Sequence, residues 1–222
     1  MKQLYNIPTI NDGKDLMISY HVDRFIGEVI IAEEYLEIKK YIPKNDLTIL
    51  DLGCNIGCFS FYMYDMAKQI YAIDIMEECV TDLKETINDS NLTKIKAFNL
   101  GIGKESGRKR IITNGEAPGR GGHHIQSMGI QGENVINAEV DVMTLNEFLN
   151  MEKIEHLDLV KMDIEGGEYD VVSALDFPES CKKIDAFVGE YHGQFGNLFD
   201  VFMQNNFKFL EFPQKHFIAH KV

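Results

Sequence analysis

The sequence has no tryptophan, few prolines and only four cysteines, and it contains no long hydrophobic run. Wholly apolar stretches such as Phe61–Tyr64 are far shorter than the roughly 18 residues that span a bilayer. The beginning of the chain (MKQLYNIPTI) lacks the apolar core of a secretory signal. No CxxC pair is present, and reduced thiols are expected. These absences predict a cytoplasmic protein without a membrane span.

Positive charge is also scarce. The chain has 22 Lys and Arg residues against 35 Asp and Glu residues, which gives a formal net charge of −13. Because the phosphates of a nucleic acid must be met by positive charge, most of this surface would repel a duplex. The one dense basic segment, Lys104–Arg110, is typical of a solvated loop. The composition therefore argues against a nucleic-acid partner.

The composition is otherwise that of an ordinary globular protein, 45% hydrophobic and 26% charged in 222 residues. Such a chain can bury a substantial core, which excludes disorder, coiled coil and collagen. No internal repeat, low-complexity tract or linker is visible, so residues 1–222 are predicted to form a single domain. The oligomeric state stays open, a homo-oligomer included.

Most of the chain alternates between short apolar runs and segments with helical spacing. This alternation predicts an α/β fold, with a mostly parallel sheet, helices on both faces and an antiparallel edge strand from a final pair of strands. The expected strands are 47–52, 70–75, 95–100, 157–164, 184–191, 207–212 and 217–222, and the expected helices are 23–41, 59–68, 77–88, 144–151 and 167–175.

Two segments depart from this alternation. Residues 1–22 look irregular and, with the helix that follows, are expected to form an N-terminal helical extension over residues 1–45. Residues 103–135 are rich in glycine and poor in apolar residues, which indicates a long flexible loop. The adjacent His123 and His124 in this loop are candidates for closing over a substrate, although such a pair is equally compatible with no role.

Polar side chains interrupt the expected strands at or near their carboxyl ends. A strand buried on both faces carries a carboxylate where its end opens into a crevice, and open α/β sheets bind ligands there. Each side chain taken alone could instead cap a helix. Their recurrence on five strands favours a site at one edge of the sheet. These side chains are Asp51, Asp74, Asn99, Asp163, and Glu190 with His192.

The loop from Asp51 to Gly57 (DLGCNIG) follows a strand and opens a helix, which is the setting of a nucleotide-binding loop. Gly53 permits a tight turn, and Gly57 permits close packing of the helix against the strand. Asn55, however, stands where a dinucleotide site needs glycine so that the pyrophosphate can approach. A cofactor without phosphates removes this difficulty, and S-adenosylmethionine is such a cofactor. An NAD(P)-dependent oxidoreductase remains the alternative.

The interpretation assigns a role to each part of this edge. Amides at the helix start receive the cofactor carboxylate, and Asp51 meets its ammonium group. Asp74 accepts hydrogen bonds from the ribose hydroxyls, and Asn99 bonds the adenine edge. The expected cofactor-binding residues are Asp51, Gly53, Cys54, Asn55, Gly57, Phe59, Asp74, Ile75, Asn99 and Leu100, with Ile75 and Leu100 packing on the adenine faces.

Two segments resemble the FkbM family of methyltransferases. LDLGCNIGCFSF (residues 50–61) is similar to that family's acidic-x-Gly-x-Asn-x-Gly loop. DLVKMDIEGGEYDVV (residues 158–172) is similar to its Lys-x-Asp-x-Glu-Gly-x-Glu signature. VDVMTLNEFL (residues 140–149) and Glu190-Tyr-His192 resemble further family elements, while Gly167 and Asn146 stand where alanine and aspartate are usual.

The resemblance implies a Rossmann-like class I methyltransferase fold with S-adenosylmethionine as cofactor. It also implies O-methylation of a hydroxyl on a sugar, polyketide or related metabolite, so that a small-molecule or glycan acceptor is the expected partner. A module that binds S-adenosylmethionine without turnover is a further alternative. Such a module would bind the cofactor and methylate no acceptor.

Methyl transfer to an alcohol needs in-line alignment and gains from a general base near the hydroxyl. The candidates at the strand edge are Asp163, Glu165, Glu190 and His192. A divalent cation held by Asp163 and Glu165 is an alternative, but no recognisable ligand spacing is present and no metal is expected. Glu165 and Glu168 also have a purely structural interpretation, because carboxylates stabilise the start of a helix.

Overall fold

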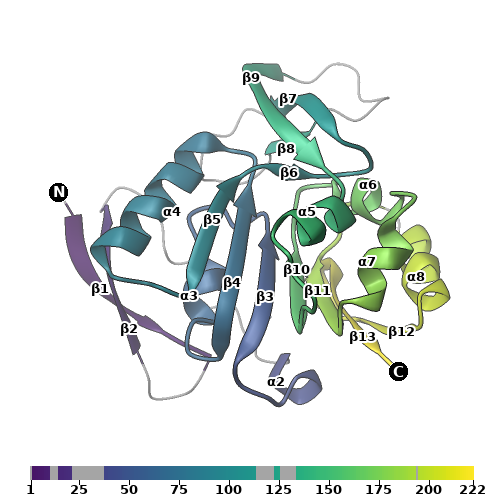
Figure 1. Ribbon diagram of the computed structural model, residues 1–222, viewed down its shortest axis with the longest axis horizontal. Coiled ribbons are helices and arrows are strands. Elements are labelled where there is room, and N and C mark those ends of the chain that lie inside the picture. The colour runs from purple at the N-terminus through teal and green to yellow at the C-terminus, as the bar shows by residue number, and fades with distance from the viewer. Residues whose placement is uncertain (1, 11–14, 22–37, 114–122, 126–133, 194) are drawn as a thin grey trace.

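The computed structural model describes residues 2–10, 15–21, 38–113, 123–125, 134–193 and 195–222 (Figure 1). Its centre is a seven-stranded sheet in the order β12–β13–β11–β10–β3–β4–β5. The strands are β3 (Leu47–Leu52), β4 (Ala67–Asp74), β5 (Ile95–Asn99), β10 (Leu159–Met162), β11 (Ala186–Glu190), β12 (Phe207–Glu211) and β13 (His216–Lys221). Each of them overlaps a strand expected from the apolar runs, and the predicted fold class is confirmed.

The strand directions follow the prediction with one refinement. β5, β4, β3, β10 and β11 are parallel to one another, whereas β13 runs antiparallel to both β11 and β12. The antiparallel strand is therefore the second strand from the edge, and β12 is the edge strand. The sequence shows that the last two strands end the sheet, but it does not show which of them pairs with β11.

The two faces of the sheet bury separate apolar clusters, because successive side chains of a strand point to opposite faces. Ile49 and Leu159 belong to one cluster, and their chain neighbours Leu50 and Val160 belong to the other. Helices cover both faces, as predicted (Figure 1). α3 (Cys58–Tyr62) and α4 (Glu77–Asp89) cover the first face, and α5 (Leu145–Met151), α6 (Glu168–Val172), α7 (Phe177–Lys182) and α8 (Phe195–Gln204) cover the second.

Some helices differ from the sequence prediction. Residues 59–68 are predicted as one helix, but α3 ends at Tyr62 and β4 begins at Ala67. No glycine or proline marks that end, so the apolar pattern continues across the turn. α7 and α8 are absent from the prediction, and α7 is too short for a helical repeat to show. None of the described helices combines the length and apolar character needed to cross a membrane.

The N-terminal region is not the expected irregular segment. β1 (Lys2–Pro8) and β2 (Asp15–His21) form an antiparallel hairpin beside α3 and α4 (Figure 1). The hairpin is held by Ile7 and Ile10, which are buried in the first apolar cluster. Neither strand alternates strictly between polar and apolar residues, so its period-two signal is weak. Most of the expected helix 23–41 lies outside the described residues, and α2 (Ile38–Tyr41) is its last turn.

The segment 103–135 is predicted as a long loop, but its described part is largely β-structure. β6 (Gly101–Ile102), β7 (Gly107–Thr113), β8 (His123–Ile125) and β9 (Asn134–Met143) form a second sheet in the order β6–β9–β7–β8. The sheet stands over the carboxyl ends of β4 and β5 (Figure 1). The side chains of Ile111, Val140 and Val142 pack in the first apolar cluster. In the sequence, Ile111 follows the basic run Arg108–Arg110, which shows no strand-like alternation of apolar residues.

Candidate active site

The strand register brings the predicted polar residues to one edge of the sheet. Asp74 at the end of β4 pairs with Asn99 at the end of β5. β10 and β11 pair in a register that places Asp163 beside Glu190, at the point where both strands end. Asp51 lies near the end of β3, between β4 and β10 in the sheet. The edge therefore has two halves, one at β3–β5 and one at β10–β11.

The loop after β3 has left-handed backbone conformations at Gly53, Asn55 and Gly57, with φ angles of 74°, 49° and 96°. A Cβ atom at Gly53 would lie 1.9 Å from the carbonyl oxygen of Asp163, so the loop can touch the segment after β10 because residue 53 is glycine. A Cβ atom at Gly57 would lie 2.5 Å from the side chain of Leu83 on α4. The close approach at Gly57 is therefore to α4, and not between the following helix and the strand as predicted.

Asp51 is fully buried beneath this loop. One carboxylate oxygen accepts a hydrogen bond from Ser60 Oγ at 2.7 Å, and the other lies 3.5 Å from Lys161 Nζ. Burial raises the pKa of the Asp51 carboxyl, and the charge of Lys161 opposes that shift. In the structure Asp51 links Ser60 of α3 to Lys161 of β10, and its predicted contact with the cofactor ammonium stays a prediction.

Lys161 connects the two halves of the edge. It is buried in β10, and its ammonium donates hydrogen bonds to the carbonyls of Gly53 at 2.8 Å and Leu52 at 3.4 Å. The same ammonium lies 3.6 Å from Asp163 Oδ2. Lys161 is not among the site residues predicted from the sequence. The signal was available, because lysine is rarely buried without a partner and this one interrupts a wholly apolar strand.

Asp74 is fixed by two backbone hydrogen bonds, one on each carboxylate oxygen. The amide of Asn55 donates to Oδ2 and the amide of Met76 donates to Oδ1, both at 2.8 Å. Burial raises the pKa of Asp74, and these two amide bonds oppose the shift. Asp74 is half-buried as a residue, and each of its carboxylate oxygens keeps a further lone pair. A fixed acceptor pair of this kind fits the two hydroxyls of an adenosyl ribose.

Asn99 lies beside Asp74 and is exposed. Its Nδ2 group donates to the carbonyls of Asp74 at 3.1 Å and Ile75 at 2.9 Å, which uses both amide hydrogens. The side chain therefore presents its oxygen, an acceptor that suits the amino group of adenine. Ile75 is half-buried and Leu100 is buried, and the two belong to opposite faces of the sheet.

Cys54 and Phe59, two of the expected cofactor-binding residues, are buried, with 3% and 2% of their surface exposed. Burial raises the pKa of the Cys54 thiol well above its usual range. Both side chains belong to the first apolar cluster, so they pack in the core beneath the loop. All four cysteines are buried and none forms a disulfide, which agrees with the expectation of reduced thiols.

A second group of ionisable side chains surrounds His192, just past the end of β11. Nδ1 of His192 lies 3.2 Å from Glu168 Oε1, whereas Nε2 lies 3.5 Å from Glu165 Oε2 and 3.7 Å from Glu190 Oε1. The bond to Glu168 raises the pKa of His192 to about 9, although burial acts in the opposite direction. In the absence of a bound metal ion, the ring is therefore protonated at neutral pH.

Asp163 and Glu190 complete this group. One oxygen of each, together with a ring nitrogen of His192, form a set of atoms that all lie within 4.8 Å of one another. Burial and the charge of Asp163 raise the pKa of Glu190. The fold therefore brings together the four residues predicted as catalytic candidates, Asp163, Glu165, Glu190 and His192.

Glu168 has more partners in this half of the edge than its position at a helix start predicts. It is the first residue of α6 and is fully buried. Its Oε1 atom accepts hydrogen bonds from the amides of Ile164 at 2.9 Å and Gly166 at 3.3 Å, in addition to its contact with His192. One carboxylate thus fixes both the turn after β10 and the imidazole ring. In the sequence, its position at a helix start could not be distinguished from ordinary helix capping.

His123 and His124 lie in β8, opposite Thr113 and Ile112 of β7. Their backbone is therefore in a strand and not in the predicted flexible loop. Their side chains lie outside the described part of the structure, so a role in substrate contact stays a prediction.

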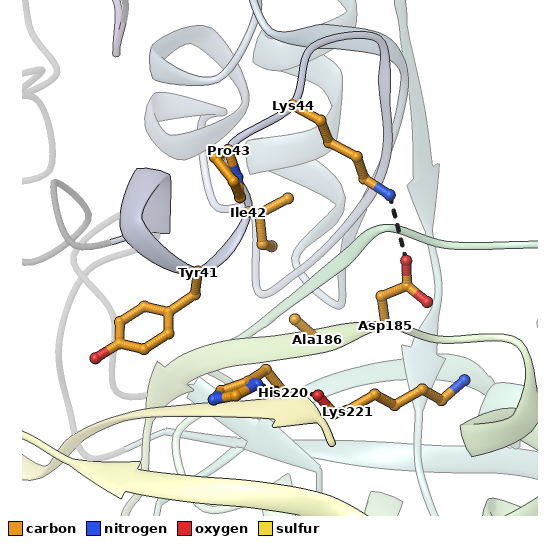
Figure 2. Close-up of a pocket in the computed structure, with 8 residues that line it drawn as sticks. All are labelled: Tyr41, Ile42, Pro43, Lys44, Asp185, Ala186, His220 and Lys221. Atoms are coloured by element: carbon orange, nitrogen blue, oxygen red, sulfur yellow. Dashed lines mark hydrogen bonds and ion pairs between the residues drawn. The ribbon is translucent and has the colours of Figure 1, made fainter.

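A cavity of about 340 Å³ lies at the opposite end of the sheet, where β11 begins and β13 ends. Tyr41, Lys44, Asp185 and Lys221 are among the residues that line it (Figure 2). The ammonium of Lys44 lies 3.3 Å from Asp185 and 2.5 Å from the buried Asp158. Because ligands of open α/β sheets bind at the carboxyl ends of the strands, this cavity is separate from the candidate site.

Comparisons with known proteins agree with this geometry. A family model described as the methyltransferase FkbM domain matches residues 51–209. Methyltransferase 1 of Beauveria bassiana (strain ARSEF 2860) is 24% identical over 168 residues, which cover 68% of this chain and 67% of the relative. Methyltransferase sdnD of Sordaria araneosa is 25% identical over 182 residues, which cover 69% of each chain.

Among solved structures, a methyltransferase FkbM from Methylobacillus flagellatus KT has a similar fold, with a TM-score of 0.52 at 13% identity. The similarity covers 79% of this chain and 43% of that longer chain. The family model spans the loop after β3, the signature around Asp163 and the residues around His192, so the resemblance found in the sequence is confirmed. The methyl donor is S-adenosylmethionine. The chain belongs to the FkbM methyltransferase family.

Proposed function

We propose that the protein transfers a methyl group from S-adenosylmethionine to a hydroxyl of a small molecule or glycan, such as a sugar, a polyketide or a related metabolite. The observation that supports this most directly is the contact between the two halves of the edge. The carbonyl oxygen of Asp163 packs so close to Gly53 that a Cβ atom at residue 53 would lie 1.9 Å from it. Lys161 also donates a hydrogen bond to the carbonyl of Gly53 in the same loop. A donor held at β3–β5 and an acceptor held at β10–β11 would therefore be neighbours.

The residues of the first half bind and orient the donor. S-adenosylmethionine supplies a methyl carbon that its sulfonium already activates. Asp74 would hold the ribose, and Asn99 would accept a hydrogen bond from the adenine amino group. Alignment of this kind is the main catalytic contribution that a protein can make to an in-line displacement.

The residues of the second half accept the proton of the acceptor hydroxyl. An alcohol is a weak nucleophile, so a base beside the hydroxyl raises the rate. Both ring nitrogens of His192 lie against carboxylates, whereas the carboxylates of Asp163, Glu165 and Glu190 are partly exposed and can accept a proton. We therefore assign the proton to one of these carboxylates and assign His192 to their orientation.

The net charge of −13 also supports a small or uncharged acceptor over a nucleic acid. The test is transfer of label from methyl-labelled S-adenosylmethionine to a panel of monosaccharides, glycans and hydroxylated polyketides, with primary amines and transfer RNA as comparison acceptors. Label on the hydroxyl compounds, lost in Glu165→Gln or Glu190→Gln, is the expected result. Label on RNA or amines alone, or cofactor binding with no transfer to any acceptor, would contradict the proposal.

A cytoplasmic location is part of the same proposal. It is supported by four buried cysteines that form no disulfide, as is usual in a reducing compartment. Fractionation of the producing cells, followed by immunodetection, would show the protein in the cytoplasmic fraction. Recovery in a secreted or membrane fraction would contradict this location.

A further inference from the structure

Three side chains at the end of β10 and β11 have the arrangement of metal ligands. Asp163 follows β10, Glu190 ends β11, and His192 lies two residues further along the chain. One oxygen or nitrogen atom from each lies within 4.8 Å of the other two. Adjacent ligands at about 2.0–2.3 Å from an ion are separated by distances within this limit.

The orientation of His192 is a second observation that indicates a metal. Metal-binding histidines usually donate the hydrogen of the second ring nitrogen to a carboxylate, which fixes the ring and leaves the first nitrogen for the metal. Here Nδ1 of His192 contacts the fully buried Glu168, and Nε2 lies on the side of Glu165 and Glu190. The amides of Ile164 and Gly166 hold Glu168 in place.

Glu168 carries a further sign of this role. Its second oxygen, Oε2, is buried and has no hydrogen-bond partner among the described residues. Burying a carboxylate costs folding free energy unless the carboxylate is paired with a positively charged group. The His192 ring is the charged or metal-bound neighbour that Glu168 contacts through its other oxygen.

The charge balance around the ring is also negative. The carboxylates of Glu165, Glu168 and Glu190 all lie within 3.7 Å of a nitrogen of His192. Asp163 adds a fourth carboxylate. On the positive side, the Lys161 ammonium lies 3.6 Å from Asp163 and is shared with Asp51, and His216 Nε2 lies 3.9 Å from Glu190 Oε2. Such an excess of negative charge favours a divalent cation between the carboxylates.

We propose that Asp163, Glu190 and His192 bind one divalent first-row metal ion, with Glu168 as a positioning residue that orients the His192 ring. A set of one imidazole and two carboxylates suits ions of the Mn²⁺ type. The inference goes beyond the proposed function and rests on it for the role of the metal. It also replaces the sequence-based expectation that no metal is bound.

An ion held by Asp163, Glu190 and His192 would act as a Lewis acid that lowers the pKa of the acceptor hydroxyl. The acceptor O–H bond loses its proton to Glu165, which lies beside His192 and outside the ligand set. The alkoxide oxygen then forms a bond to the methyl carbon, and the breaking C–S bond leaves its electron pair on sulfur. The step consumes no oxidant or reductant, and the metal keeps its charge.

The test measures the binding of Mn²⁺ alone to chelator-treated, full-length protein. The electron paramagnetic resonance signal of free Mn²⁺ reports how much of the ion remains unbound. One Mn²⁺ per chain is expected. Glu168→Gln should lower the affinity for Mn²⁺ by about 10–100-fold. Asp163→Asn and His192→Gln each remove a ligand and should lower the affinity further. The matched control is Asp185→Asn, which alters the only other such cluster among the described residues, His156, Asp158 and Asp185, and should leave binding unchanged.

The ligand variants could fail to fold, so a second measurement uses Asp185→Asn, which keeps Asp163, Glu190 and His192. Electron spin echo modulation should show a nitrogen of His192 coupled to the bound Mn²⁺. Absence of Mn²⁺ binding, absence of the nitrogen coupling, or loss of binding in Asp185→Asn alone would overturn the inference. Methyl transfer that persists after chelation would overturn the role of the metal without affecting the proposed function, and Mn²⁺ binding without any methyl transfer would contradict only the proposed function.

Discussion

Lys161 is the side chain that connects the loop after β3 to the segment after β10, and its removal should be costly. Lys161→Met leaves the fully buried Asp51 without its cation. Breaking a buried ion pair in this way costs about 3–5 kcal/mol in the free energy of unfolding. Urea denaturation measures this loss, with Lys208→Met on the exposed surface of β12 as the control. A loss similar to that of the control would contradict the bridging role.

Gly53 and Gly166 both have positive φ, 74° and 99°, but they differ in the space around them. A Cβ atom at Gly53 would overlap the Asp163 carbonyl oxygen, whereas nothing lies within 4 Å of a Cβ atom at Gly166. Gly166→Ala should therefore cost only the backbone strain of about 1–2 kcal/mol. Gly53→Ala should cost more and should also abolish cofactor binding. Thermal unfolding and S-adenosylhomocysteine titration of the two variants compare them directly, and equal effects would contradict this account.

At the scale of residues, the sequence predicted the side chains that end strands and missed those that support them. Asp74 and Glu190 are visible because a carboxylate at the end of an apolar run is unusual. The burial of Asp51 could not be predicted, because it depends on Ser60 and Lys161, which come from other elements. The role of Glu168 depends on a contact with His192, 24 residues further along the chain.

At the scale of elements, α5 offers a test of local structure. Thr144 Oγ1 accepts a hydrogen bond from the Glu147 amide at 3.2 Å, and Glu147 accepts one from the Thr144 amide at 2.9 Å. The Thr144 hydroxyl also donates to Asp176 at 2.7 Å. Thr144→Ala should lower the free energy of unfolding by about 1–2 kcal/mol, while Thr144→Ser, which keeps the hydroxyl, should lose little. Equal loss in both variants, measured by chemical denaturation, would refute the capping role.

The elements that the sequence predicted well are those with strong periodicity and clear ends. β3 has the expected bounds, and α4 differs from its expected range by one residue. The second sheet was missed because β7 and β9 pair across a long sequence separation, and their pairing is not visible in local patterns. β1 and β2 were missed because tertiary contacts with α3 and α4 stabilise them.

At the scale of the whole molecule, an ion pair between Lys44 and Asp158 connects the segment after α2 to the start of β10, at the end of the sheet away from the site. Burial alone would raise the pKa of Asp158, but hydrogen bonds from Lys44 and the Thr48 amide outweigh it and lower this pKa. Because the folded pKa lies below the unfolded value, the contribution of Asp158 to stability is complete above about pH 4 and is lost as the pH falls through the folded pKa.

Lys44→Met should therefore lower the free energy of unfolding at pH 7 by about 1 kcal/mol, a modest value because Lys44 is half exposed to solvent. The difference from wild type should shrink below about pH 4. Urea denaturation at pH 7 and at acidic pH measures both values. Lys182→Met, which removes an exposed pair with Glu179, is the control and should change little at either pH. A difference that grows on acidification would contradict the sign of the shift.

In the proposed function, one edge of the sheet holds the methyl donor at β3–β5 and the acceptor at β10–β11. Calorimetric titration with S-adenosylhomocysteine of wild type, Asp74→Ala and Glu190→Gln tests it most directly, with Glu77→Gln on the exposed start of α4 as the control. Wild type, Glu190→Gln and the control should bind alike, and Asp74→Ala should bind about 100-fold more weakly because two hydrogen bonds to a carboxylate are lost. Unchanged binding in Asp74→Ala, or an equal loss in Glu190→Gln, would contradict the division of the edge into these two halves.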